Sequence, residues 1–271
     1  MQDLEQQKSW YSAVADAYNR VRPRYPKELI GRVVELAQLQ NDAIILEVGC
    51  GPGTATAAFA QLGFSMVCLE PSQESCQLAR QNCAQYPNVE ILNITFEEWE
   101  LELERFNAVL AATSFHWVSP EVRYAKAAAA LQNNGSLMLL WNTPPQPGYE
   151  IYQVLDEVYQ SLAPSVVGYE TIETHQENLR RQGQAVIDSG CFKELVSEQM
   201  MCEVTYSIDD YLALLSTLSP YIRLDSQQRD SLFAGLRERL KRHCPENLQL
   251  SYLSVFQMAS KIISDVVVTP T

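Results

Sequence analysis

The sequence predicts an α/β fold in which a mostly parallel sheet is covered by helices on both faces. Short β-branched segments alternate with helical segments between residues 28 and 141, and parallel strands with crossover helices produce this alternation. A glycine-rich stretch at residues 49–53 directly follows the first of these strands. Such a turn between a strand and a helix is typical of sheets that bind ligands at the carboxyl ends of their strands.

The composition describes a chain that can bury a substantial core. It has 271 residues, 46% of them hydrophobic, with a formal net charge of −13 and a pI near 4.7. A charge of this sign repels phosphate backbones, because nucleic-acid binding depends on Lys and Arg that neutralise phosphates. We therefore expect a small-molecule or protein partner and no nucleic acid. The oligomeric state is not predicted.

The start of the chain, MQDLEQQKSWYSAVADAY, has neither the basic end nor the unbroken apolar run of a signal peptide, and no stretch of about 18 apolar residues occurs. We expect a cytoplasmic protein that does not enter a membrane. The seven cysteines are scattered without a Cys-x-x-Cys pair. This spacing predicts reduced thiols and neither a disulfide framework nor a metal site.

The first predicted helix covers residues 28–39, where Leu29, Ile30 and Val33 begin one apolar stripe. A single stripe indicates an amphipathic helix that packs on a sheet. Residues 43–48 are apolar, partly β-branched and end at the glycines. They predict a buried parallel strand that enters a tight turn.

A strand, helix, strand unit follows from this beginning. Residues 54–62 suit a helix that a glycine closes, and the apolar strand at 64–69 stops before Glu70-Pro71. Ser72 can cap a further helix near residues 73–85. The remaining elements of this half are strands at 89–92, 108–112 and 137–140, a helix at 121–131 and a turn at Asn133-Asn134-Gly135.

The composition changes at residues 143–148, which contain three prolines. Proline continues neither a helix nor a central strand, so this segment is a predicted loop. Beyond it we expect helices within 150–188 and 208–243, and strands near 194–199 and 249–256. The two late strands bring the predicted Rossmann-like sheet to seven, and the helices around them form a lid.

The glycine-rich turn is the most informative segment. Gly49, Gly51 and Gly53 allow the backbone to turn sharply and to approach a ligand closely. A tight turn without a ligand is the alternative, but the position between a strand and a helix, with Glu47 just ahead, favours binding.

The spacing of the glycines distinguishes between nucleotides. A dinucleotide fingerprint places its third glycine at position 54, which is Thr here, so a pyrophosphate is not the best fit. Glu47 adds negative charge that disfavours phosphates and suits the amino group of an amino-acid-bearing ligand. Glu70 follows the second strand, where a carboxylate can accept hydrogen bonds from ribose hydroxyls; the alternative is an ordinary exposed carboxylate.

The segment Ile45-Leu46-Glu47-Val48-Gly49-Cys50-Gly51-Pro52-Gly53-Thr54 resembles motif I of class I methyltransferases that use S-adenosylmethionine (SAM). Within that superfamily the chain resembles the small-molecule branch called methyltransferase type 11, near the trans-aconitate methyltransferase-like proteins. The closer resemblance comes from the entry segment Ala15 to Pro26, the Ser114-Phe115-His116-Trp117 segment and the stretch Tyr211 to Tyr221.

The resemblance implies a set of site residues. Those expected to bind SAM, and its product S-adenosylhomocysteine, are Tyr18, Arg22, Glu47, Gly49, Gly51, Gly53, Glu70, Pro71, Thr95, Phe96 and Thr113. Those expected to contact the methyl acceptor are Tyr11, Trp117, Thr217 and Tyr221. The family usually has an acidic residue near the adenine amine, and residues 93–96 offer none at the matching place.

His116 is the expected catalytic residue, either as a base or as a group that orients the acceptor. A histidine bonded structurally beneath the lid is the alternative. His175 and His243 lie in polar helical stretches and are expected at the surface. The basic cluster Arg20, Arg22, Arg24 and Lys27 fits a solvated segment, with Arg22 as the member most suited to an anionic ligand.

The predicted function is transfer of a methyl group from SAM to a small-molecule acceptor, such as a carboxylate or hydroxyl, by in-line displacement without a metal. A non-catalytic SAM-binding protein and, with less support, an NAD-dependent oxidoreductase remain as alternatives. We expect one methyltransferase domain over residues 1–271. Its expected parts are cover helices at 1–40, a cofactor-binding core at 41–142, helical lid insertions at 143–188 and 203–247, and final strands at 189–202 and 248–262.

Overall fold

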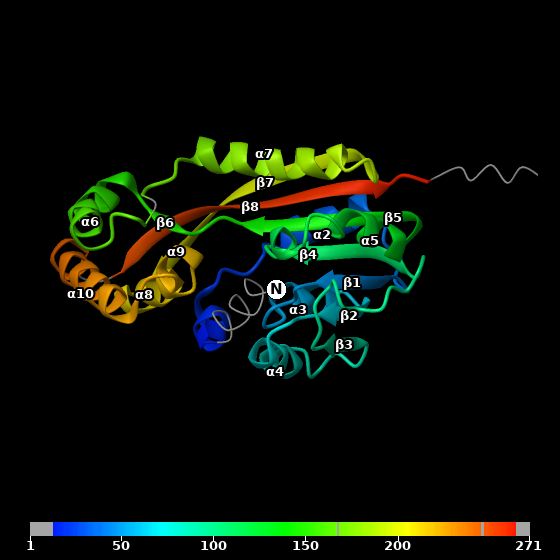
Figure 1. Ribbon diagram of the computed structural model, residues 1–271, viewed down its shortest axis with the longest axis horizontal. Helices are drawn as coiled ribbons and strands as arrows, with labels where there is room; N and C mark the ends of the chain where they lie inside the picture. Colours follow the sequence, from blue (N-terminus) through cyan, green and yellow to red (C-terminus); the bar gives the residue numbers. More distant parts are fainter. Residues whose placement is uncertain (1–12, 167, 245–246, 264–271) are drawn as a thin grey trace, which may run out of the picture.

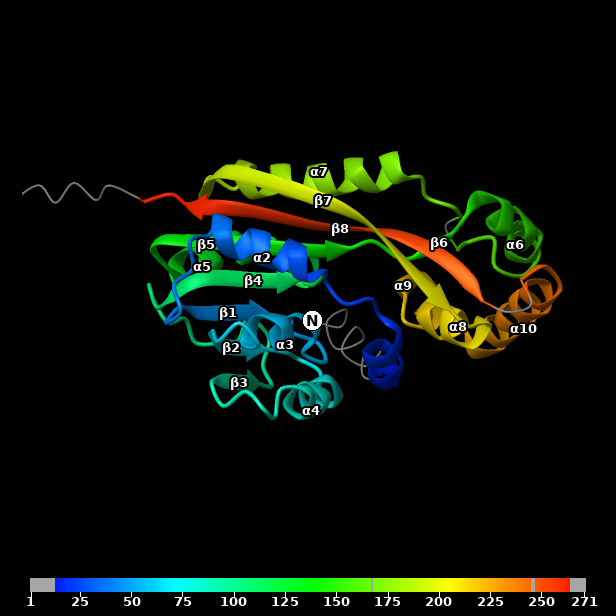
Figure 2. The same ribbon diagram turned by 180° about the vertical axis from the view of Figure 1, so that it is seen from behind.

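The computed structural model describes residues 13–166, 168–244 and 247–263. Its centre is an eight-stranded sheet in the order β3-β2-β1-β4-β5-β8-β6, and β7 pairs with β8 outside this order. Helices lie on both faces of the sheet, and a group of helices closes one end (Figures 1 and 2). The predicted α/β class with a mostly parallel Rossmann-like core is confirmed.

The cofactor half of the sheet is parallel throughout. Its strands are β1 (Ile44–Val48), β2 (Ser65–Leu69), β3 (Val89–Leu92), β4 (Phe106–Ala112) and β5 (Leu131–Asn142). Its helices are α2 (Lys27–Leu36), α3 (Thr54–Ala60), α4 (Gln73–Asn82) and α5 (Arg123–Ala130). Parallel pairing brings the carboxyl ends of these strands to one edge, where open α/β sheets bind ligands.

The other half is antiparallel: β8 (Leu248–Lys261) pairs with β5, and β7 (Phe192–Tyr206) pairs with β8. The predicted seven strands become eight because Gln146 and Pro147 form a short strand, β6, against Leu250 and Ser251. Proline has no amide hydrogen, so it is tolerated at this edge. A two-residue pairing leaves no periodic pattern in the sequence that could have revealed it.

The predicted turn at Asn133-Asn134-Gly135, placed before a strand, is wrong. These residues lie inside β5, which begins at Leu131 directly after α5. Leu131 pairs with Phe106, and the next pair is Ser136 with Ala108, so the polar residues between them bulge out of the ladder. The buried Leu131 side chain anchors the start of the strand.

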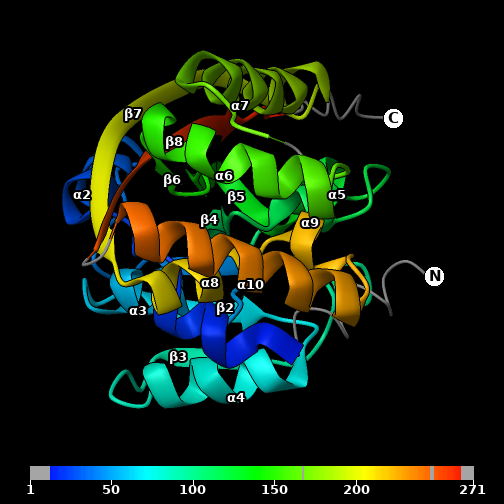
Figure 3. The ribbon, with the colours of Figure 1, turned by 90° about the vertical axis from the view of Figure 1, so that its left-hand side faces the viewer.

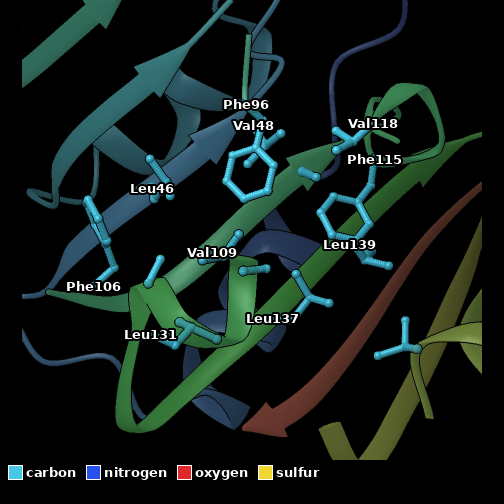
Figure 4. Close-up of a cluster of buried hydrophobic side chains, with 14 of the residues drawn as sticks. Leu46, Val48, Phe96, Phe106, Val109, Phe115, Val118, Leu131, Leu137 and Leu139 are labelled. Atoms are coloured by element: carbon cyan, nitrogen blue, oxygen red, sulfur yellow. The ribbon is translucent and has the colours of Figure 1, made fainter. Parts of the chain in front are cut away.

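Two hydrophobic cores fill the space on the two faces of the sheet. One face packs against α2, α3 and α4. The other packs against α5 and α7 (Ile172–Asp188), and Figure 4 shows Leu46, Val109 and Leu139 from β1, β4 and β5 pointing into it. Helix α7 therefore lies along the sheet and contributes Val186 to this core, which also contains Phe192 of β7. Residues 143–188 were expected to form part of the lid.

A third core forms the lid. Its helices are α6 (Tyr149–Leu162), α8 (Ile208–Ser216), α9 (Ser219–Ile222) and α10 (Ser226–His243). Figure 3 shows α10 crossing the end of the molecule beside α6 and α8. Helices α6 and α10 approach closely because Gly235 faces Val158, where a Cβ would come within 2.8 Å of the valine. The helical residues 13–21 end beneath this lid, where Val21 joins its core.

The two histidines expected at the surface differ. His243 is exposed. His175 is 8% exposed, with Nε2 at 2.8 Å from the Gln146 amide nitrogen and Nδ1 at 3.3 Å from the Glu170 carboxylate. The surface prediction for His175 is therefore wrong, because Gln146, which lies 29 residues away, and the nearby Glu170 contact its two ring nitrogens.

Candidate active site

A cavity of about 400 Å³ opens at the carboxyl ends of the parallel strands. Its wall consists of the loops that follow β1, β2, β3, β4 and β5, together with the entry segment and the lid. The lining residues outside the predicted set include Tyr25, Glu97, Asn142 and the lid residues Leu218, Ser219 and Pro220. The segments that line it are therefore distant in sequence, and the sheet brings them together.

The glycine turn after β1 is fixed to β2 and left open toward the cavity. The amides of Gly49 and Cys50 donate to the Leu69 carbonyl at 2.8 and 3.0 Å. A Cβ at Gly49 would meet Ser114 at 2.7 Å. Gly51 has φ +55°, lines the cavity, and has no heavy atom within 4 Å of an added Cβ, so its surroundings leave room for a ligand.

Gly53 was expected among the cofactor-binding residues. It does not line the cavity, and a Cβ there would come within 3.2 Å of the Ala79 backbone and the Cys83 sulfur. Its φ of +83° is in the left-handed region that glycine adopts without strain. Gly53 thus allows α4 to pack closely against the start of α3.

Glu70 lies in the cavity wall at the carboxyl end of β2, as expected. One carboxylate oxygen accepts from the Gly51 amide at 2.9 Å and the other from the Ser72 amide at 2.8 Å. Burial raises the pKa of Glu70, and these two backbone hydrogen bonds oppose the rise. Each oxygen retains acceptor capacity, so the carboxylate can receive two further hydroxyl donors.

Glu47 lies behind the turn and does not reach the cavity. It is fully buried and accepts a 2.6 Å hydrogen bond from the Thr56 hydroxyl, while its Oε1 has no partner among the described residues. Burial raises the pKa of Glu47 to about 8. Glu47 is therefore not placed to contact a ligand's amino group in the cavity, as was expected.

The loop after β3 supplies a second wall. Thr95 and Phe96 line the cavity as expected, and Phe96 stacks on Trp99 with ring centroids 6.1 Å apart. Pro71 lines it from the loop after β2. Glu97 also lines the cavity, and its carboxylate accepts a hydrogen bond from the Ser119 amide at 2.8 Å. It lies one residue beyond 93–96, where the family's acidic residue was expected. Residue spacing alone did not reveal it.

His116 stands on a short 3-10 turn, Phe115–Trp117, which is separated from the end of β4 by Thr113 and Ser114. It lines the cavity beside Trp117, and its ring lies 4.7 Å from the Trp117 ring and 5.7 Å from the Trp141 ring. His116 is exposed to solvent, although several protein groups pack around its ring. Desolvation and, less strongly, the Arg123 guanidinium lower the pKa of His116 to about 4. The imidazole is therefore neutral at neutral pH.

The entry segment crosses the mouth of the cavity and holds the lid. Tyr18 and Arg22 both line the cavity, and the Arg22 guanidinium lies 4.8 Å from the centre of the Tyr18 ring. Arg22 donates to the Thr217 hydroxyl and to the Thr217 carbonyl, both at 2.9 Å. These bonds connect the entry segment to the residue that follows α8.

Of the residues expected to contact the acceptor, only some line the cavity. Trp117 lines the cavity, but Thr217 is fully buried behind Arg22. Tyr221 lies in the lid core, with its hydroxyl 2.8 Å from that of Tyr159. Tyr11 is outside the described residues. Thr217 and Tyr221 therefore support the lid, and their neighbours Leu218 and Pro220 line the cavity.

Residues 45–135 match a family model described as a methyltransferase domain. An uncharacterised methyltransferase of Mycobacterium tuberculosis is 32% identical over 133 residues, which are 49% of this chain and 52% of the relative. An uncharacterised methyltransferase of Schizosaccharomyces pombe is 23% identical over 84% of this chain and 85% of its own. The chain thus matches about half the length of the mycobacterial relative.

Solved structures show the same fold. A candidate type II methyltransferase from Anaeromyxobacter dehalogenans has a TM-score of 0.66 at 19% identity and covers 88% of this chain and 97% of its own. Phosphoethanolamine N-methyltransferase 2 of Haemonchus contortus, solved with phosphomonomethylethanolamine and S-adenosylhomocysteine, has a TM-score of 0.51 at 14% identity over 94% of this chain and 57% of its own.

Residues 45–135 therefore resemble a methyltransferase domain, and the chain shares its fold with methyltransferase structures. No helix among the described residues is both long and apolar enough to cross a membrane. Within the same residues, no cluster of three His, Cys, Asp or Glu side chains is placed to hold a metal ion.

Gly51 provides a test of whether the turn reserves space for a ligand. Gly51→Ala should lower SAM affinity by at least about tenfold, because the methyl group enters the cavity. Gly190→Ala is the matched control, since Gly190 has φ +70°, open space around an added Cβ and no place in the cavity wall. Titration calorimetry of both variants gives the comparison. Equal losses in the two would show that backbone strain, and not occupied space, is the cause.

Glu47 predicts a pH-dependent stability. The unfolded carboxyl ionises near pH 4.5 and the folded one near 8, so this residue costs stability progressively as the pH rises from 4.5 to 8. Glu47→Gln should therefore gain stability relative to the parent over that range, by up to a few kcal/mol at pH 8. Urea unfolding without ligand at pH 5 and pH 8 measures the difference. Parallel stability curves would contradict the assignment.

Proposed function

We propose that this protein transfers a methyl group from SAM to a small-molecule acceptor. The observation that carries the proposal is one cavity in which Gly51 leaves open space, Glu70 presents a carboxylate, and His116 faces the same volume. The first two fit an adenosyl ligand and the third lies where an acceptor would meet it. On the resemblance of the entry segment and the Phe-His-Trp segment, we include the trans-aconitate-like branch in the proposal. The cytoplasmic location expected from the sequence is also part of it.

The cofactor contacts follow from the lining residues. Glu70 would accept hydrogen bonds from the two ribose hydroxyls. Thr95, Phe96 and Pro71 would flank the adenine. Tyr18, Arg22, Gly49, Gly51 and Thr113 would surround the amino-acid end, with Arg22 suited to a carboxylate because no described acid pairs with it. Glu47 and Gly53 would act by shaping the turn.

The chemical demand on the protein is mainly geometric. When bound, SAM supplies a methyl group that its sulfonium has already activated for displacement. The chain's own residues then have to hold the acceptor in line with that methyl group and exclude water. Trp117, Leu218 and Pro220 provide apolar walls for this purpose.

His116 would orient the acceptor. A neutral imidazole can accept a hydrogen bond from an O–H or N–H of the acceptor, and its own ring N–H can donate to a carboxylate. A pKa of about 4 makes His116 a weak base, because efficient proton removal needs a pKa near the working pH. The site therefore favours acceptors that are nucleophilic without a strong base, among which carboxylates and amines are included.

The geometry favours an enzyme over a SAM-binding protein that does not turn over. A lid packed solidly onto the cofactor turn would have left no room for a second molecule. Instead the cavity extends from the glycine turn to His116 and to the lid residues Leu218 and Pro220. An NAD-dependent oxidoreductase is disfavoured by Thr54, which stands where a dinucleotide fingerprint requires glycine.

Ligand binding tests the cofactor assignment. Calorimetric titration of the protein with SAM, S-adenosylhomocysteine and NAD should show binding of both adenosyl compounds and none of NAD. Glu70→Ala should weaken SAM binding by about ten- to a hundredfold, the loss expected for two hydrogen bonds to a charged group. Glu74→Ala is the control, because it removes a carboxylate on α4 that lies nearby but outside the cavity wall. Binding of NAD alone would overturn the proposal.

The role of His116 is tested by its pH dependence on an acceptor found by screening. Activity should stay constant as the pH falls toward 5 and decline only near pH 4, where the imidazole gains its proton. His116→Gln should keep more activity than His116→Ala, which should lose about tenfold, because an amide oxygen preserves an acceptor of hydrogen bonds. Equal inactivity of both variants, with a decline near pH 6.5, would indicate a base instead.

A further inference from the structure

Thr113 has an unusual backbone conformation at the edge of the cavity. Its φ is +57°, and of the four described non-glycine residues with positive φ it is the one that lines the cavity. A β-branched residue in this region costs on the order of 1 to 3 kcal/mol, so the surrounding contacts have to impose it.

Three hydrogen bonds hold Thr113 in place. Its amide donates to the Leu140 carbonyl at 2.8 Å. Its hydroxyl oxygen lies 2.8 Å from the Tyr25 hydroxyl and 3.4 Å from the Asn142 amide, which donates to it. Two of these contacts go to β5, and the third goes to the entry segment. The Tyr25 contact is therefore the one that comes from outside the sheet.

The strained residue lies just before the turn that carries His116. The next residue, Ser114, donates its hydroxyl to the Val48 carbonyl, and the 3-10 turn Phe115–Trp117 follows at once. The dihedral angles of Thr113 consequently set the direction in which this turn leaves β4. A change at Thr113 would move the His116 ring relative to the cavity.

We propose that Tyr25 is a positioning residue whose hydroxyl holds Thr113 in its left-handed conformation and so fixes where His116 stands. Its consequence for methyl transfer rests on the proposed function. Tyr25 is suited to this role because burial and the neighbouring Tyr18 raise its pKa, so the phenol keeps its proton. Arg22 connects the same segment to the lid, and the position of His116 thereby depends on the entry segment that closes the cavity.

The chain contains three histidines, so their imidazole resonances can be followed individually by NMR without cofactor or acceptor. The loss of one signal in His116→Gln assigns His116. In Tyr25→Phe we expect the His116 signal to shift and its pKa to rise from about 4 toward 6.5, as the ring loses the protein groups that desolvate it and moves away from Arg123. The signals of His175 and His243 should titrate as in the parent.

Two further variants make the test specific. Tyr206→Phe removes another hydrogen bond to the entry segment, from the Tyr206 hydroxyl to the Val21 carbonyl, and should leave His116 unchanged. Thr113→Gly adopts φ +57° without strain, so adding Tyr25→Phe to it should have little further effect on His116. An unchanged His116 in Tyr25→Phe, or an equal shift in Tyr206→Phe, would overturn the inference. Failure to bind SAM would overturn the proposed function alone, because the NMR readout requires no ligand.

Discussion

The parallel pairing of β1 with β2 and β4 is the constraint on which the site depends. Glu47 stands opposite Cys68 on one side and Leu110 on the other, so the three strands end at the same level. The glycine turn, Glu70 and the turn bearing His116 then emerge from adjacent strand ends. Because this register is fixed by buried side chains on both faces of the sheet, a one-residue slip would exchange the two cores.

The entry segment and the lid complete the wall of the cavity that the strand ends begin. Tyr25, Arg22 and Val21 bind respectively to the end of β4, to the lid and to β7. Their partners lie between 88 and 195 residues away in sequence. The short entry segment therefore connects the loops that line the cavity to the lid.

Local signals explain what the sequence could predict. The glycines at 49 and 51 and the acid at 70 follow strands whose apolar pattern is strong, so their placement at the strand ends followed from position alone. Glu97 and Tyr25 gave no such signal, because they reach the cavity through loops whose course depends on tertiary packing. Thr217 and Tyr221 were expected to contact the acceptor from a resemblance of sequence, but a helix has several faces, and the lid core determines which one turns inward.

The long strand β8 belongs to two parts of the molecule at once. Its residues from Ser254 to Ser260 pair with β5 in the sheet, while Leu248 and Leu250 pack in the lid core. The sheet and the lid therefore share the strand β8. Because one continuous strand pairs with β5 and also contributes side chains to the lid core, we expect sheet and lid to lose their structure in one cooperative step.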